Sequence, residues 1–162
     1  MSLFKVLATI ATFLLGSKDN GVKESTEPLK PIPTKKSIPE EYLHPSAIIE
    51  GVDVELLTAV FDIIKNLRNQ GYHAIIHNGM RTKAQAEANA KAGVGIKKSK
   101  HILGKAVDII DSRYGWDEDY IEQIRDFRVA LGKEVYKYPN LIWGGSWHKS
   151  YGALGDWAHV EI

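Results

Sequence analysis

Apolar residues recur at helical spacing through residues 53–71. Each of five apolar residues lies three or four positions from another of the set, which places them on one face of an α-helix. Gly71 closes the pattern, and glycine commonly ends a helix. The pattern therefore predicts a helix that buries one face in a core. The predicted inward-facing residues are Leu57, Val60, Phe61, Ile64 and Leu67.

Two further segments have helical patterns. Residues 82–93 are rich in alanine and open with a capping-box pair, Thr82 and Gln85. Residues 117–132 carry apolar side chains at helical spacing and end at Gly132. The residues of this last helix that are predicted to face inward are Tyr120, Ile121, Ile124, Phe127 and Leu131.

Four short runs are typical of β-strands: residues 72–79, 104–111, 140–145 and 156–162. Helices and strands do not alternate strictly along the chain, as they would in a fold built from βαβ units. The order therefore predicts an α+β domain with a small, mostly antiparallel sheet and flanking helices.

The last of these runs, in GDWAHVEI, has an unusual polar face. Alternate residues of a strand point to opposite sides of the sheet. One side of this run is apolar and suits a core, whereas the other carries an imidazole and a carboxylate. The predicted members of that second face are Trp157, His159 and Glu161.

The start of the chain differs in kind from the rest. Residues 1–16 contain an unbroken apolar run, which fits the core of a secretory signal and is short for a membrane span. Residues 17–41 hold most of the prolines and favour a semi-rigid linker. We therefore expect an exported or membrane-anchored domain over residues 42–162. A helix packed on that domain is the alternative for residues 1–16.

Composition limits the chemistry that the chain can use. The formal net charge of +1 gives no electrostatic reason to expect a nucleic-acid partner. The chain has no cysteine, which excludes disulfides and thiolate metal sites. Any metal ion must therefore be held by histidine, aspartate or glutamate.

The nearest pair of histidines does not predict a metal site. His73 and His77 are four residues apart, but they lie in the predicted strand 72–79. Four residues of a strand span about 13 Å, too far for two ligands of one ion. We interpret both as structural or substrate-lining residues, and His44 as a surface residue.

A more distant set is suited to zinc. His101 and Asp108 have an odd spacing, but Gly104 between them permits a bend that would turn both toward one centre. With His159 they supply two imidazoles and one carboxylate, the ligand set of a catalytic zinc with one open position. Asp156 is a nearby carboxylate that could take a proton from water. The alternative for Asp108 is an ordinary edge-strand aspartate.

Three separated motifs resemble one known family. SKHILGKAVDI matches the S-x-H-x-x-G-x-A-x-D signature of the zinc peptidases that include D-alanyl-D-alanine carboxypeptidases and dipeptidases. GGSWHKSYGALGDWAHVEI is similar to the ending of the phage L-alanyl-D-glutamate endolysins of that family, and GMRTKAQ resembles its G-Y-R-T-x-x-Q segment. The resemblance covers residues 53–162. It departs from the family at Met80, often aromatic there, and at Ala158, usually proline.

The resemblance implies a hedgehog/DD-peptidase-like fold and one Zn²⁺ per chain. It implies that His101, Asp108 and His159 hold the ion, that Asp156 is the general base and that Arg81 binds the substrate carbonyl or stabilises the oxyanion. A fixed guanidinium charge suits developing negative charge on a tetrahedral carbon.

Several other residues have both a functional and a structural interpretation. Ser99 either contacts the site or begins a turn, and Gln85 either contacts substrate or completes the capping box. Glu161 either orients a ligand or is an edge-strand carboxylate. Trp147, with Trp143 and Trp157, either lines a cleft or packs in the core.

These observations predict a zinc-dependent peptidase that cuts peptidoglycan stem peptides, between L-Ala and D-Glu. The alternatives are a D-alanyl-D-alanine carboxypeptidase and a wall-binding module whose zinc is structural. We expect a monomer that faces the cell wall, with membrane contact through residues 1–16 and a bacterial or phage-encoded origin.

Overall fold

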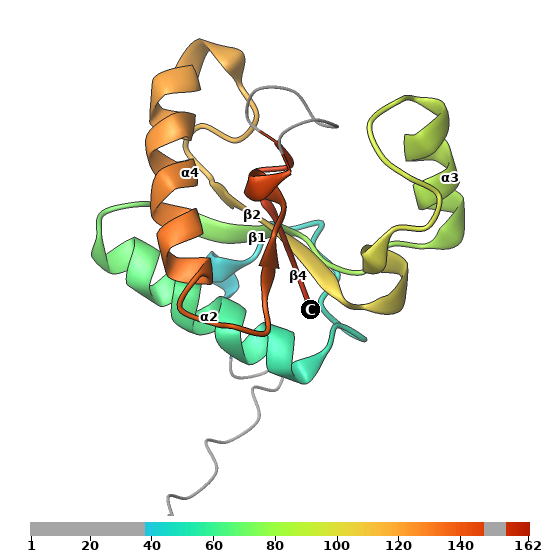
Figure 1. Ribbon diagram of the computed structural model, residues 1–162, viewed down its shortest axis with the longest axis horizontal. Coiled ribbons are helices and arrows are strands. Elements are labelled where there is room, and N and C mark those ends of the chain that lie inside the picture. Colours follow the sequence, from blue (N-terminus) through green and yellow to red (C-terminus); the bar gives the residue numbers. More distant parts are fainter. Residues whose placement is uncertain (1–37, 148–154) are drawn as a thin grey trace, which may run out of the picture. The chain divides into compact units, whose positions relative to one another are not determined.

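Helices cover a small antiparallel sheet in the computed structural model, which describes residues 38–147 and 155–162 (Figure 1). The α+β prediction is confirmed for this part of the chain. Its helices are α2 (Val54–Asn69), α3 (Lys83–Lys91) and α4 (Ile121–Val135), with short 3-10 helices η2 (Glu40–Tyr42), η3 (Lys100–Leu103), η4 (Glu118–Tyr120) and η5 (Gly144–Ser146). Its strands are β1 (Ala74–Asn78), β2 (Ala106–Asp111), β3 (Ile142–Trp143) and β4 (His159–Glu161).

The sheet order is β1-β2-β4-β3, and each neighbouring pair is antiparallel. Every residue of β2 is buried, and β4 inserts between β2 and β3. The register places Asn78 of β1 and His159 of β4 on either side of Asp108 in β2. Three distant parts of the sequence therefore meet in one row across the sheet.

Helix α2 provides the broad apolar face that its spacing predicts. Its N-cap, Asp53, accepts hydrogen bonds from the first-turn amides of Glu55 and Leu56, and Gly71 follows its end with φ of 92°. The helix packs against α4 and β1. Phe61 is only partly buried, whereas Ile63 is fully buried. The apolar face is therefore wider than the predicted stripe.

Helix α4 does not end at Gly132 as predicted, because it continues to Val135. A Cβ at Gly132 would lie 2.5 Å from an atom of the Trp143 ring, so this glycine allows close ring packing. The prediction that Tyr120 faces inward is wrong, because this residue precedes the helix and is 42% exposed.

The two C-terminal strands are shorter than predicted. The run 140–145 forms only the two-residue β3 followed by η5, and β4 begins at His159 instead of residue 156. A turn precedes β4, in which the Asp156 carbonyl accepts from the His159 amide. Because Trp157 lies in this turn and packs in the core, it does not share the face of His159 as predicted.

The predictions for residues 1–16 and for most of the linker fall outside the described residues. Ile38 is buried and Glu40–Tyr42 forms η2, so folded structure begins before the predicted boundary at residue 42. Among the residues that the structure describes, no helix combines the length and apolar character needed to cross a membrane.

Gly104 makes the bend that its place between His101 and Asp108 predicts, and its replacement tests the fold. Its φ is 67°, and a Cβ would collide with the carbonyl oxygen of Gly51. Gly71 has φ of 92°, and no atom lies within 4 Å of the point that its Cβ would occupy, so it controls for backbone strain alone.

We expect Gly71→Ala to lower the free energy of unfolding by about 1–2 kcal/mol. Gly104→Ala should lower it by about 3 kcal/mol or more, because it adds a steric collision to the strain. Urea denaturation measures both. Equal losses would show that the Gly51 segment moves aside without cost.

Candidate metal centre and its cleft

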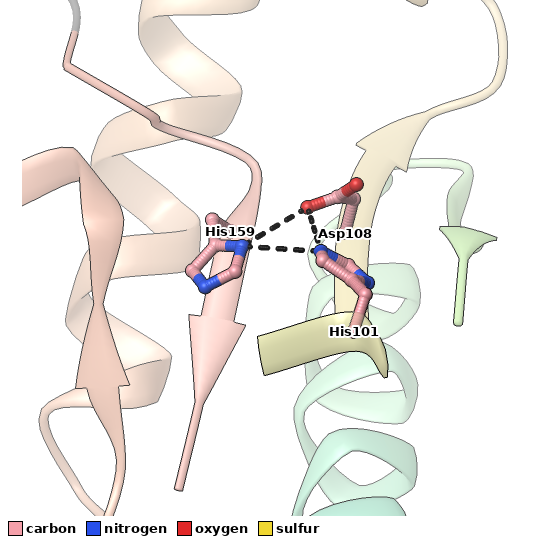
Figure 2. A group of neighbouring side chains, drawn as sticks. All are labelled: His101, Asp108 and His159. Carbon is pink, nitrogen blue, oxygen red and sulfur yellow. Dashed lines mark hydrogen bonds and ion pairs between the residues drawn. The ribbon is translucent and has the colours of Figure 1, made fainter. Parts of the chain in front are cut away.

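Three side chains from η3, β2 and β4 converge on one point (Figure 2). His101 Nε2 lies 3.3 Å from Asp108 Oδ1 and 3.3 Å from His159 Nδ1. His159 Nδ1 lies 3.4 Å from the same oxygen of Asp108. All three residues are buried. The three residues predicted from sequence as ligands are therefore brought together.

Local structure explains how His101 and Asp108 turn toward one centre. Ser99 caps η3 by accepting a hydrogen bond from the His101 amide, and Gly104 ends η3 in the left-handed conformation. The chain then enters β2, where Asp108 pairs with His159. The odd sequence spacing is thus resolved by a 3-10 turn followed by a bend.

The outer nitrogen of each imidazole has a hydrogen-bond acceptor that sets its tautomer. His101 Nδ1 donates to the carbonyl oxygen of Gly79 at 2.7 Å, and His159 Nε2 donates to Glu161 Oε2 at 3.0 Å. In the neutral forms, the lone pairs of the other two nitrogens then face Asp108. Two lone pairs and a carboxylate oxygen directed at one point favour a cation there.

The dimensions of this triangle suit zinc. Ligand bonds of about 2.0–2.1 Å in a tetrahedron place ligand atoms about 3.3–3.4 Å apart. The three observed separations are 3.3, 3.3 and 3.4 Å. Three protein ligands leave a fourth tetrahedral position for water or substrate, which is the arrangement of catalytic zinc.

Asn78 holds the second oxygen of Asp108. Its side-chain amide donates to Asp108 Oδ2 at 2.8 Å, and Arg81 approaches the same oxygen at 3.8 Å. Oδ1 therefore faces the two imidazoles, and Asp108 can offer this one oxygen as a metal ligand. Sequence reasoning missed Asn78, although its place three residues before Arg81 in HNGMR was a usable signal.

The charges of the site depend on one another. Burial alone would raise the pKa of Asp108, but His101 and His159 outweigh it and hold this pKa well below its usual range. Burial alone would lower the pKa of His159, but Asp108 and Glu161 outweigh it and raise this pKa. A raised pKa favours the protonated form of His159, so a cation that binds this imidazole competes with protons.

The triangle opens into a cleft of about 970 Å³. Arg81, Trp147 and Asp156 line it together with the three candidate ligands. Asp156 is partly buried; this burial, with a further contribution from Asp108, raises the pKa of its carboxyl group. A carboxyl group with raised pKa in the cleft of the three candidate ligands suits proton transfer.

The residues that had both a functional and a structural interpretation differ in where the structure places them. Ser99 and Glu161 line the cleft and contact His101 and His159, as described above. Gln85 accepts from the Thr82 amide in a capping box and is not among the cleft-lining residues, so its capping interpretation is the one observed. Trp147 lines the cleft, with its ring 5.3 Å from that of His159. Trp143 and Trp157 are core residues.

Two histidines outside the metal centre, His44 and His77, contact each other. His73 precedes β1, and His77 lies at a β-bulge between Ile76 and Asn78. His44, interpreted from sequence as a surface residue, has partners: its ring lies 4.6 Å from that of His77 and its Nδ1 is 2.7 Å from Ser46 Oγ. Parallel bridging of Leu43 with Ile76 brings His44 to this position.

Zinc affinity is expected to fall as pH is lowered from about 8 to about 5, because protons compete for His159 below its raised pKa. Glu161→Gln replaces the charged acceptor of His159 Nε2 with a neutral amide and should weaken zinc binding by about 10- to 100-fold. Competition with a chromophoric chelator measures both effects.

The matched control for this experiment is Glu87→Gln, the same change at an exposed position of α3. It should bind zinc like the parent chain. An affinity independent of pH, or equal losses in the two variants, would contradict the assigned roles of His159 and Glu161.

No protein-family model and no curated protein matches the chain. Among solved structures it is similar to the Serratia marcescens L-Ala D-Glu endopeptidase ChiX, with 23% identity and a TM-score of 0.51, over 76% of this chain and 91% of that one. It is also similar to a variant of the vancomycin resistance D,D-pentapeptidase VanY in complex with Zn(II), with 20% identity and a TM-score of 0.51, over 77% and 82%. The chain therefore has the fold of these two proteins, the fold that its motifs imply.

Proposed function

We propose that this chain is a zinc-dependent peptidase that hydrolyses peptidoglycan stem peptides between L-Ala and D-Glu. The triangle of His101, Asp108 and His159 carries the proposal, because its size, lone pairs and open side suit a catalytic zinc. The two similar structures support the substrate class, since both are named as peptidases and one contains Zn(II).

His101, Asp108 and His159 would hold the ion, with Asn78, Gly79 and Glu161 orienting them. A bound zinc ion supplies a Lewis acid that polarises a carbonyl group and acidifies water. A structural zinc would need a fourth protein ligand, whereas the described residues offer three. This favours an enzyme over the alternative of a non-catalytic wall-binding module.

Asp156 would transfer the proton during hydrolysis, and Arg81 would stabilise the negative charge that develops. The Asp156 carboxylate takes a proton from the attacking water and passes it to the amine that leaves, so it ends the cycle as it began. Arg81 places a permanent positive charge at the cleft wall, where it stabilises negative charge that develops on the carbonyl oxygen. The scissile amide is thus replaced by a carboxylate and an amine.

Two candidate activities share the same chemistry and differ in the peptide bond that is cut. The L-Ala D-Glu endopeptidase and the D,D-pentapeptidase have equal TM-scores to this chain. An Asp-Trp-x-His ending, GDWAHVEI, favours the endopeptidase through its family resemblance. An enzyme of either kind works on the cell wall, and we propose that this domain acts outside the cytoplasmic membrane.

Digestion of purified peptidoglycan by the zinc-loaded chain tests this function. We expect new amino-terminal D-Glu and carboxy-terminal L-Ala ends, detected by mass spectrometry, and their loss when a chelator removes zinc. Release of D-Ala alone would instead identify the carboxypeptidase. Absence of both products would exclude peptidoglycan peptidase activity.

Asp156→Asn should keep zinc but lower kcat by about 10²–10⁴-fold, because it removes the proton acceptor and leaves the ligands intact. His159→Ala should lose both zinc and activity. Zinc content is measured by atomic absorption and activity by the digestion assay.

Asp126→Asn is the matched control, since Asp126 is exposed on α4 and outside the cleft. It should keep both zinc and activity. Full activity in Asp156→Asn would refute the assigned base.

A further inference from the structure

The indole of Trp116 is an exposed aromatic surface inside the cleft. Trp116 follows β2 on the loop that leads to η4 and is 48% exposed. It lines the same cleft as the three candidate ligands. A large apolar side chain left open to solvent in a cleft favours a ligand-binding role.

Neighbouring rings hold this indole in place. The Trp116 ring lies 4.9 Å from that of Trp157 and 6.1 Å from that of His77, the latter edge to face. Trp157 belongs to the core and contacts Phe127, while His77 is backed by His44 at 4.6 Å. The indole thus contacts two packed rings, which restrict its movement.

The loop that carries Trp116 is itself well fixed. The buried Asp111 side chain accepts hydrogen bonds from the His73 amide and from the amide and guanidinium of Arg113. The Asp111 carbonyl accepts from Tyr114 and from Gly115, whose φ is 56°. A surface that is ordered before binding loses little entropy when a ligand arrives.

The β-bulge of β1 joins this surface to the metal centre. The register shift between Ile76 and Asn78 lets consecutive residues serve two purposes. His77 contacts the Trp116 ring, and Asn78 donates to Asp108. The indole therefore has a set position relative to the atoms that would cut the substrate.

We propose that Trp116 is a binding platform for the pyranose ring of the muramoyl sugar that carries the stem peptide. The C–H groups on a pyranose face are weakly positive and pack against the negative face of an indole. This inference rests on the proposed function and adds a sugar requirement to its substrate.

Chain length makes the platform selective for one bond. In a muramoyl peptide, only a lactoyl group and L-Ala separate the sugar from the L-Ala–D-Glu bond. The D-Ala–D-Ala bond lies three residues further on, or about 10 Å in an extended peptide. A sugar that stacks on Trp116 therefore holds the L-Ala–D-Glu bond in the cleft that contains the candidate ligands, and the D-Ala–D-Ala bond lies further from the sugar by that length.

Two substrates that differ only in the sugar test the platform: N-acetylmuramoyl-L-Ala-D-isoglutamine and N-lactoyl-L-Ala-D-isoglutamine. We expect the zinc-loaded chain to prefer the first by about three- to tenfold in kcat/KM, the range expected for one aromatic stacking contact. In Trp116→Ala the ratio should fall toward one, and Trp116→Phe should retain part of it. Tyr136→Ala, which removes an exposed ring of the α4 end outside the cleft, should keep the full preference.

Binding to zinc-loaded Asp156→Asn, measured by calorimetry, separates the platform from catalysis. The sugar-bearing compound should bind about three- to tenfold more tightly, and Trp116→Ala in this background should remove the difference. If neither compound is cleaved by the parent chain but this binding difference persists, the platform stands and the peptidase assignment fails. Equal binding of the two compounds, or equal losses for both in Trp116→Ala, would overturn the platform.

Discussion

The carboxylate of Asp108 is buried at the centre of the sheet, and its charge determines what can surround it. A buried carboxylate without compensation is costly, so its neighbours must supply positive charge or hydrogen-bond donors. One oxygen receives the Asn78 amide, and the other faces His101 and His159. Because the outer N–H group of each imidazole donates to its own acceptor, the two inner nitrogens and the carboxylate favour a cation between them. The same group therefore links the stability of the sheet to the chemistry of the cleft.

Strand pairing connects the surroundings of Asp108 to the rest of the sheet. β4 lies between β2 and β3, so the last residues of the chain are as central to the sheet as its middle. Val160 is buried in the core while its neighbours His159 and Glu161 form part of the metal centre. Strand β4 therefore contributes both a core residue and a candidate metal ligand. Around this centre, the loops of Arg81 and Trp116 line the cleft in which we propose that substrate binds.

Local pattern predicted local structure well where one segment contained the relevant information. The bend at Gly104 follows from the left-handed conformation that glycine adopts readily, and the capping box of Gln85 follows from its spacing to Thr82. Gly132 was misread because a glycine at a helix stop and a glycine beneath an aromatic ring look alike in sequence. Asn78 and Trp116 were missed because their partners, Asp108 and Trp157, lie far from them along the chain.

The sequence by itself determined most of the buried faces of α2 and α4, the α+β class, the cysteine-free ligand chemistry and, through motif resemblance, three ligand candidates. Only the tertiary structure decided that these ligands form a triangle of suitable size, which nitrogen of each imidazole faces it, and which tryptophan is exposed in the cleft. The reason is physical. Helical periodicity and turn preference act over a few residues, whereas the β2–β4 register and the packing of rings depend on groups brought together by the whole core.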